Sequence, residues 1–223
     1  MLQPSTLKFL KDLRKNNTKE WFEKNRKAYE AAKEDFASLV NTVIAKFGKK
    51  EESIATLTAK DCLFRINRDV RFSKNKAPYK SNMGASIIHG GKKSELAGYY
   101  FHFEPGGKSF VGGGRYMAEP DAMKKIRQEI DYSWEEFRKI IKNKKFVGFY
   151  GDLENGEGWS LSREPKGYEK DNPAISYIKL KSWVATTPVS DAELTDKNVV
   201  KKLVNAFETL QPMVQFLNRA LAG

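Results

Sequence analysis

Basic residues are concentrated in "RINRDVRFSKNKAPYK", residues 65 to 80. The segment holds six cations and one acid: Arg65, Arg68, Arg71, Lys74, Lys76 and Lys80, with Asp69. Arginine binds phosphate or carboxylate groups through paired hydrogen bonds, and lysine adds a point charge. Pro78 excludes a helix and favours extended backbone at Ala77. The segment therefore predicts a strand end followed by an ordered, anion-binding loop from Asp69 to Lys80.

Strand geometry limits how these arginines can act together. In a regular strand, Arg65 and Asn67 share one face and Arg68 points to the other. The three arginines converge only if the chain bends after Asn67, and Asp69 is a suitable position for that bend. The alternative interpretation is that Asp69 and other acids neutralise the arginines in structural salt bridges.

A second feature is the glycine run in "FVGGGRYMAEPDAM". Gly112, Gly113 and Gly114 follow a predicted strand, Arg115 comes next, and a helix is expected near Pro120. A glycine turn that leads toward a helix N-terminus can bind an oxyanion with backbone N–H groups. The alternative is a strand bulge or close backbone packing. The run has neither the P-loop spacing nor a dinucleotide fingerprint, so it indicates no cofactor.

Acid–base candidates are His102 and Tyr79. Alternation in "YYFHFE" places Tyr100, His102 and Glu104 on one strand face. His102 could exchange protons with a ligand, or it could be a hydrogen-bonded structural residue, and no nucleophile–base signature accompanies it. Farther along the chain, "LSREPKGYEKDNP" predicts a rigid polar loop around Lys166–Tyr168, which lies over a pocket or forms a plain surface turn. In "YIKLKSW", Lys179 and Lys181 are expected on one strand face.

The surrounding patterns predict the elements that position these residues. Apolar spacing predicts N-terminal helices over residues 5–47, with Asn17 or Thr18 capping a long helix that ends at Gly48. Four strand-like segments fill the sheet region 63–114: "LFRIN", "GASIIHG", "GYYFHFE" and "KSFVGGG". The turn "EPGGK", residues 104–108, is expected to join the last two.

The C-terminal half is expected to be mainly helical. Helices are predicted from Pro120 through Ile130 and from Ser133 in a helical and loop-rich region 119–184. That region includes a long connection at residues 151–173, which either contains a short hairpin or carries function. A short helix and a strand follow, and a last helix spans 195–221. The order predicts a single α+β domain, 1–223, mainly an antiparallel sheet with helices packed around it.

Composition narrows the class of protein. The chain has 223 residues, 40 basic and 28 acidic, and a net charge of +12. Most lysines alternate with glutamates, as on a solvated helix face. No apolar run reaches bilayer length and no signal peptide is evident, so we expect a cytoplasmic protein with no membrane contact. A single cysteine, Cys62, excludes an internal disulfide and is expected to be buried. With only His89 and His102 beside it, no zinc site is expected.

The motifs together resemble one family. "RDVRFSKNKAPYK", "FVGGGRYMAEPDAM", "LSREPKGYEKDNP" and "LKSW", in this order and spacing, resemble the bacterial and fungal family catalogued as domain of unknown function 2461. The resemblance runs from "FLKDLRKNNTKEWFEKNRKAY" to the last helix. It implies single-domain proteins with no assigned activity or cofactor. Ser162 and Glu164 depart from the more basic lead-in expected before Pro165.

Three functions compete at this stage. In the leading hypothesis, Arg65, Arg68, Arg71, Lys76, Tyr79 and Lys80 converge with Gly112–Arg115 on a small phosphate- or carboxylate-bearing ligand. If that ligand reacts, the cations would stabilise charge on a transferred or cleaved phosphate, with help from His102 or Tyr79. The second hypothesis is a nucleic-acid-binding module with exposed aromatic side chains and salt-dependent affinity. The third is a scaffold protein whose arginines are internal struts.

Overall fold

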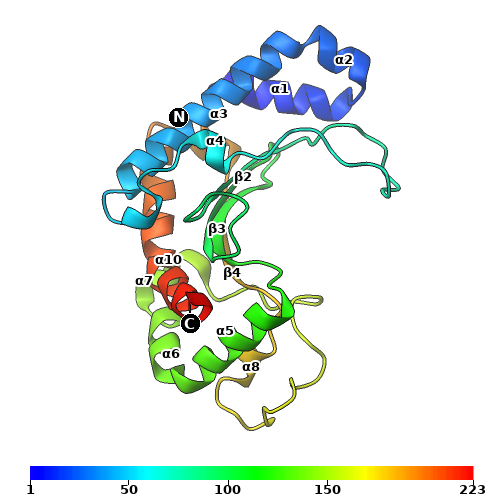
Figure 1. Cartoon of the computed structure of the whole chain (residues 1–223). Helices are drawn as coiled ribbons and strands as arrows, with labels where there is room; N and C mark the ends of the chain where they lie inside the picture. Colours follow the sequence, from blue (N-terminus) through cyan, green and yellow to red (C-terminus); the bar gives the residue numbers. More distant parts are fainter. Residues whose placement is uncertain (223) are drawn as a thin grey trace. The chain divides into compact units, whose positions relative to one another are not determined.

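The computed structural model describes residues 1–222, and Figure 1 shows the order of their elements. The first half contains α1 (Pro4–Lys15), α2 (Lys19–Lys24), α3 (Arg26–Phe47), a 3₁₀ turn (Glu52–Ile54), α4 (Ala59–Cys62), β1 (Met83–Ile87) and β2 (Gly98–Phe103). The second half contains β3 (Ser109–Arg115), α5 (Pro120–Tyr132), α6 (Trp134–Ile141), α7 (Lys144–Tyr150), α8 (Ile175–Ile178), β4 (Trp183–Val189), α9 (Asp191–Leu194) and α10 (Val199–Ala222). The predicted α+β class is confirmed.

The strands form one antiparallel sheet in the order β1-β2-β3-β4. As predicted, the turn at residues 104–108 joins β2 to β3. Gly106 and Gly107 adopt φ angles of +91° and +71° there, which favour glycine. The Asp191 carboxylate accepts their backbone N–H groups at 3.0 and 3.2 Å, so the turn is held from outside as well.

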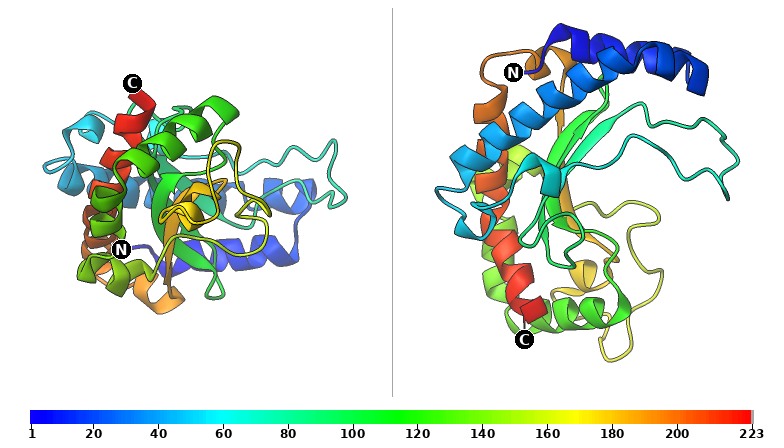
Figure 2. Two further views of the ribbon diagram at one scale, coloured as in Figure 1. Left: turned by 90° about the horizontal axis from the view of Figure 1, so that it is seen from below. Right: turned by 45° about the horizontal axis from the view of Figure 1, so that its top comes forward.

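The predicted strand "LFRIN" is not part of this sheet. Residues 63–67 make isolated bridges only, between Leu63 and Ala85 and between Asn67 and Tyr79. Figures 1 and 2 show that residues 65–80 instead form a narrow ribbon that extends beyond β1. The prediction of extended backbone for this segment was correct, but its hydrophobic pattern could not indicate whether a continuous partner strand is present.

The long N-terminal helix predicted to end at Gly48 is divided into α2 and α3. Thr18, rather than Asn17, caps α2, because its Oγ1 accepts the Trp21 N–H at 3.2 Å. The division falls at Asn25, whose side-chain amide donates to the Trp21 carbonyl at 2.8 Å. An asparagine side chain that competes for helix carbonyls in this way weakens the regular turn.

The last helix begins later than residue 195. A short helix, α9, occupies Asp191–Leu194 and is capped by Ser190, and α10 begins at Val199. The short α8 and strand β4 match the elements expected in "AISYIKLKSWVATTPV". The connection at residues 151–173 contains no helix and no strand, and Ser160 makes one isolated bridge to Leu180.

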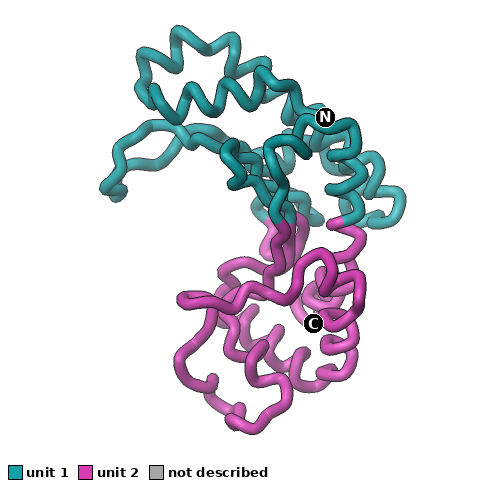
Figure 3. Tube along the Cα trace, turned by 180° about the vertical axis from the view of Figure 1, so that it is seen from behind, with its two compact units in different colours: residues 1–93, 100–111, 188–205 teal, residues 94–99, 112–187, 206–223 magenta. Residues whose placement is uncertain are grey.

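The chain forms two compact units, coloured separately in Figure 3. Unit 1 comprises residues 1–93, 100–111 and 188–205, and unit 2 comprises residues 94–99, 112–187 and 206–223. Strands β2, β3 and β4 each have residues in both. Whether these units constitute the single domain predicted over residues 1–223 stays a prediction.

Each unit has its own aromatic core. In unit 1, Phe36 of α3 packs against Phe101 and Phe103 of β2, with ring centroids 5.8 and 6.0 Å apart. In unit 2, Tyr99 contacts Phe207 of α10 at 5.1 Å, and Phe137 contacts Phe216 at 5.0 Å. Alternation along β2 therefore buries the odd-numbered side chains and leaves Tyr100 and His102 on the opposite face.

Candidate functional site

The basic segment folds as a two-stranded ribbon whose base is fixed by backbone hydrogen bonds. The Arg68 N–H donates to the Pro78 carbonyl at 2.9 Å, and the Lys80 N–H donates to the Ile66 carbonyl at 2.8 Å. These bonds flank the Asn67–Tyr79 bridge. The ribbon thus brings Arg65 and Lys80 together at its base and places Asp69 to Ala77 in the loop beyond it.

Tyr79 anchors this ribbon to the N-terminal helices. Asn17 binds both backbone groups of Tyr79, donating to its carbonyl at 2.9 Å and accepting its N–H at 3.1 Å. The Tyr79 ring stacks on Phe22, with centroids 3.9 Å apart and an interplanar angle of 14°. The side chain is buried, and burial raises the pKa of its phenol. The predicted ligand-binding tyrosine is therefore a packing residue in this structure.

Three of the predicted binding cations contact the loop itself. The Arg68 guanidinium donates to the Ala77 carbonyl at 3.1 Å and to Ser73 Oγ at 3.4 Å. Lys76 Nζ donates to the Val70 carbonyl at 3.1 Å. Arg71 pairs with Asp69 through two nitrogens, at 3.0 and 2.7 Å.

These contacts alter the pKa values of the Arg71–Asp69 pair. Hydrogen bonds from Arg71 hold the pKa of the Asp69 carboxyl below its usual range, and Asp69 raises the pKa of Arg71. Both groups are exposed, so the pair shapes the loop more than it stabilises the fold. Of these three cations only Arg71 has the carboxylate partner that the salt-bridge interpretation expects, whereas Arg68 and Lys76 bind oxygens of the loop itself.

Arg65 and Lys80 have a different environment. Within residues 1–222 neither side chain has an acid at ion-pair distance, although the charge of Arg65 contributes to the lowered pKa of Asp69. Burial lowers the pKa of the Lys80 ammonium, and the positive charge of Arg65 lowers it further. The Lys80 ammonium lies 5.7 Å from the centroid of the Phe64 ring. Two neighbouring cations that lack a carboxylate partner are suited to bind an anion between them.

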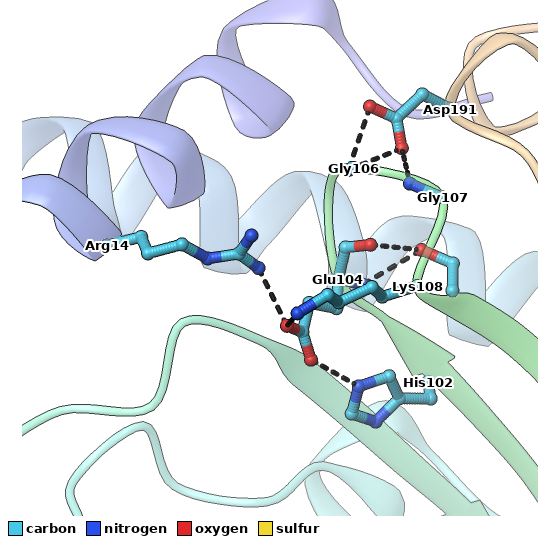
Figure 4. A network of polar contacts seen from close by, with 8 residues as sticks. Arg14, His102, Glu104, Gly106, Gly107, Lys108 and Asp191 are labelled. Atoms are coloured by element: carbon cyan, nitrogen blue, oxygen red, sulfur yellow. Dashed lines mark hydrogen bonds and ion pairs between the residues drawn. The ribbon is translucent and has the colours of Figure 1, made fainter.

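A chain of polar side chains crosses the open face of β2 close to these cations, and Figure 4 shows its acidic end. His102 Nε2 is 3.0 Å from Glu104 Oε2, and His102 Nδ1 is 3.3 Å from the Tyr100 hydroxyl. Arg14 of α1 donates to Glu104 Oε1 at 2.7 Å. Phe64 connects the two features, because its ring is 6.3 Å from that of Tyr100.

This geometry defines the tautomer of a neutral His102. A carboxylate only accepts hydrogen bonds, so His102 Nε2 must carry the proton that faces Glu104. Nδ1 then accepts the proton of the Tyr100 hydroxyl. Burial raises the pKa of the Tyr100 phenol, so its hydroxyl donates to the imidazole as a neutral group. Stacking of His102 on Phe110, at 4.8 Å and 10°, fixes the ring.

Sequence alternation predicted the grouping of Tyr100, His102 and Glu104, but not Arg14. Arg14 lies 90 residues away in sequence from its partner. Its position in the last turn of α1 is typical of any helix end, so no sequence pattern marks its role.

The glycine run lies in unit 2 and within β3, rather than in a turn after the strand. A Cβ atom at Gly112 would lie 2.2 Å from the Ala185 carbonyl oxygen, and one at Gly114 would lie 1.9 Å from that of Trp183. Gly113 is equally close to Gly98. Close backbone packing therefore explains why glycine occupies these positions.

Arg115 at the end of β3 has an unusual environment. Its Nε atom is buried and has no hydrogen-bond partner within the described residues. A buried guanidinium nitrogen without an acceptor is unfavourable unless a ligand or solvent satisfies it. Because Arg115 and the glycines belong to a different unit from Arg65 and Lys80, their convergence on one ligand stays a prediction.

The loop containing Lys166–Tyr168 forms a hydrogen-bonded turn. The Tyr168 N–H donates to the Pro165 carbonyl at 3.2 Å, and Gly167 has a φ of +92°. Lys179 follows α8 directly and is not on a strand face with Lys181, because β4 begins only at Trp183. Lys179 is 3.3 Å from Glu164, so that acid neutralises this lysine.

Two further features bear on the chemistry. Cys62 is buried, as predicted, and burial raises the pKa of its thiol to about 11, which suppresses the reactive thiolate. Within residues 1–222 no group of three or more His, Cys, Asp or Glu side chains has the arrangement of a metal site.

No helix in the described part of the chain is long and apolar enough to cross a bilayer.

The fold defines the class, an α+β protein with a four-stranded antiparallel sheet. The chain belongs to the family described as conserved hypothetical protein (DUF2461), whose sequence model matches residues 5–216. This match confirms the family resemblance carried by the four sequence motifs. None of the curated proteins and none of the solved structures compared with the chain matches it.

Proposed function

We propose that this protein binds an anionic ligand, bearing a phosphate or carboxylate group, at the base of the 65–80 ribbon. The observation that carries the proposal is that the charges of Arg65 and Lys80 repel each other while no acid lies at ion-pair distance from either side chain within residues 1–222. Asp69, whose pKa the charge of Arg65 lowers, is paired with Arg71. Three other cations of the segment have partners, because Arg68 and Lys76 donate to loop carbonyls and Arg71 pairs with Asp69. Lys74 is exposed to solvent. An anion between Arg65 and Lys80 would remove the repulsion that lowers the pKa of Lys80.

The ligand's location follows from the neighbours of Lys80. Its ammonium lies over the Phe64 ring, which also contacts Tyr100. A ligand held by the two cations can thus contact an apolar ring face and the hydroxyl of Tyr100. Arg65 supplies a planar fork for two oxygens, and Lys80 supplies a single charge.

Calorimetric titration with inorganic phosphate, pyrophosphate and citrate at low ionic strength tests this proposal. We expect at least one of these anions to bind, and Arg65→Ala and Lys80→Met each to weaken binding about 10-fold or more, the loss of one charged hydrogen bond. Arg163→Ala is a control matched in charge, because Arg163 is exposed in the loop at residues 151–173. Absence of binding by all three anions, or an equal loss in Arg163→Ala, would refute the proposal.

A second candidate function is acid–base chemistry on the bound anion, favoured by the Tyr100–His102–Glu104 chain. Tyr100 would pass its proton to His102 while it takes the proton of a water that attacks phosphorus, and Glu104 would stabilise the charged ring. The P–O bond to the leaving group breaks as the new P–O bond forms, and the leaving oxygen departs as the alkoxide or phenolate. Arg14 would hold Glu104 in position.

Assays of phosphate monoesters, with p-nitrophenyl phosphate as the first substrate, test this candidate. We expect His102→Gln to lower kcat by about 100-fold or more and to leave pyrophosphate binding within a factor of about two. If the protein binds pyrophosphate but turns over none of the monoesters, the acid–base candidate fails and the binding function stands.

A further inference from the structure

The tip of the 65–80 ribbon presents one aromatic ring almost entirely to solvent. Phe72 is 95% exposed. The Arg71 guanidinium lies 5.7 Å from its ring centroid, which leaves the other face of the ring open. Asp69 holds that guanidinium through two nitrogens, so its position over the ring is fixed.

Internal hydrogen bonds order the loop that carries Phe72. Arg68 binds the Ala77 carbonyl and Ser73 Oγ from inside, and Lys76 binds the Val70 carbonyl. The Ser73 N–H closes a turn on Val70 at 3.3 Å. A loop that is already ordered loses little conformational entropy when a ligand binds to its tip.

A second exposed ring lies at the base of the same ribbon. Phe64 is 43% exposed, and Lys80 lies over it at 5.7 Å. A single exposed apolar side chain is ordinary on a protein surface. Two exposed rings, each under a cation and both on a segment with six cations and one acid, form a recognisable pattern. Proteins that bind single-stranded nucleic acids combine aromatic platforms with basic residues in this way.

We propose that the 65–80 ribbon, with Phe64, binds single-stranded nucleic acid. A backbone phosphate lies between Arg65 and Lys80, and a base stacks on the open face of Phe72. The phosphate part rests on the proposed anion site, and Phe72 adds the base. Phe72 lies five positions after Asn67, a reach of at most about 17 Å, so an oligonucleotide a few nucleotides long can span the phosphate site and the ring.

The observations favour a single strand over other anionic partners. In a duplex the bases are stacked on one another and cannot reach Phe72 without being extruded. A membrane surface attracts cations too, but insertion is driven by buried apolar area. Within residues 68–78, Phe72 is the only large apolar side chain that is exposed. One ring suffices for a stacked base and supplies little area for a bilayer.

Fluorescence anisotropy with labelled oligothymidylate of about eight nucleotides tests the inference in the full-length chain. We expect Phe72→Ala to weaken binding roughly 5- to 150-fold, the change produced by losing one stacked base. Phe72→Trp should retain affinity and show fluorescence quenching by the bound base. Tyr132→Ala is the control, because Tyr132 is a 77% exposed aromatic residue of α5 in unit 2.

Parallel titrations separate this inference from the anion site. Phe72→Ala should bind pyrophosphate like the wild type, whereas Arg65→Ala should lose affinity for both pyrophosphate and oligonucleotide. If pyrophosphate binds and the oligonucleotide does not, the nucleic-acid inference alone is wrong. If the oligonucleotide and all three anions fail to bind, both proposals are wrong. Equal oligonucleotide affinity of wild type and Phe72→Ala would overturn the inference. So would Phe72-dependent binding to vesicles of phosphatidylserine and phosphatidylcholine without oligonucleotide binding.

Discussion

At the scale of single residues, the partner of each cation in the ribbon is set by which oxygen atom lies within hydrogen-bond distance. Arg68 and Arg71 are three positions apart, yet Arg68 binds a carbonyl and Arg71 binds a carboxylate. Arg65 and Lys80 differ from these residues, because their charges repel each other and neither has an acid at ion-pair distance within residues 1–222. A charged hydrogen bond is among the stronger contacts available to a solvent-accessible ligand. The ligand specificity of the ribbon is therefore expected to depend on these two residues more than on the total charge of the segment.

A prediction at this scale concerns Glu193, whose side chain completes the capping box that Ser190 begins at the N-terminus of α9. Its carboxylate accepts hydrogen bonds from Lys202 Nζ at 2.6 Å and from the Ser190 N–H at 2.8 Å. These hydrogen bonds, chiefly the one from Lys202 and next the one from Ser190, lower the pKa of Glu193 from 4.5 to about 2. Because the folded-state pKa is depressed, the stabilisation is fully present above pH 4.5 and is lost as the pH falls through 2.

Glu193→Gln should therefore lower the free energy of unfolding by about 1 kcal/mol near neutral pH, the typical value of a helix cap contact at a partly exposed site. Denaturant unfolding of both proteins between neutral pH and pH 2 measures the difference, which should shrink in acid. Glu157→Gln serves as the control, because Glu157 is exposed in the 151–173 connection. A difference that stays constant with pH would contradict the assigned role of the carboxylate.

At the scale of elements, sequence patterns predicted what depends on neighbouring residues and missed what depends on distant ones. The β2–β3 hairpin was predicted correctly, because the alternation of side chains and the turn glycines are local signals. The segment "LFRIN" has a similar strand-like pattern, but its residues form only two isolated bridges, from Leu63 to Ala85 and from Asn67 to Tyr79. Asn17 or Thr18 was predicted as a helix cap; Thr18 has that role, whereas Asn17 binds Tyr79, which is 62 residues away. For the same reason the contact of Arg14 with Glu104, 90 residues away, could not be predicted from the sequence.

The ribbon loop gives a prediction for one element. Arg68→Ala removes the donors to the Ala77 carbonyl and to Ser73 Oγ, so residues 69–77 should open more often. Chymotrypsin should then cleave after the exposed Phe72 several-fold faster than in the wild type. Global stability should change by less than about 1 kcal/mol, because both contacts are local to the loop.

Lys74→Ala is the matched control for this loop, since Lys74 is an exposed cation of the same segment. It should leave the cleavage rate unchanged. Equal cleavage of Arg68→Ala and wild type would show that the Arg68 contacts do not order the loop. A large loss of global stability would instead assign Arg68 to the core of unit 1.

At the scale of the whole molecule, the two units differ from domains that occupy successive stretches of sequence. Each is built from three separate segments, and the chain passes between them within strands β2, β3 and β4. Sequence patterns could not reveal this division, because each unit joins segments that are far apart in the chain. Long-range pairing within each unit must therefore form before its core is complete.

This organisation predicts that residues 1–93 do not fold alone, although they contain α1 to α4 and β1. In the intact chain, Phe36 packs on Phe101 and Phe103, and the Leu2 N–H donates to the Leu194 carbonyl at 3.0 Å. The fragment lacks these partners and would expose the Phe36 ring to water. We expect it to show no cooperative thermal transition by near-ultraviolet circular dichroism, whereas the intact chain does.

Mixing the fragment with residues 94–223 distinguishes missing partners from a harmful chain break. Lys93 is exposed in the connection between β1 and β2, so a break after it removes no buried contact. The two fragments together should regain a cooperative transition and the near-ultraviolet signal of the aromatic core. A cooperative transition in residues 1–93 alone would show that helices α1 to α4 and β1 form an independent core. In that case the segments 100–111 and 188–205 would add to unit 1 without being required for it.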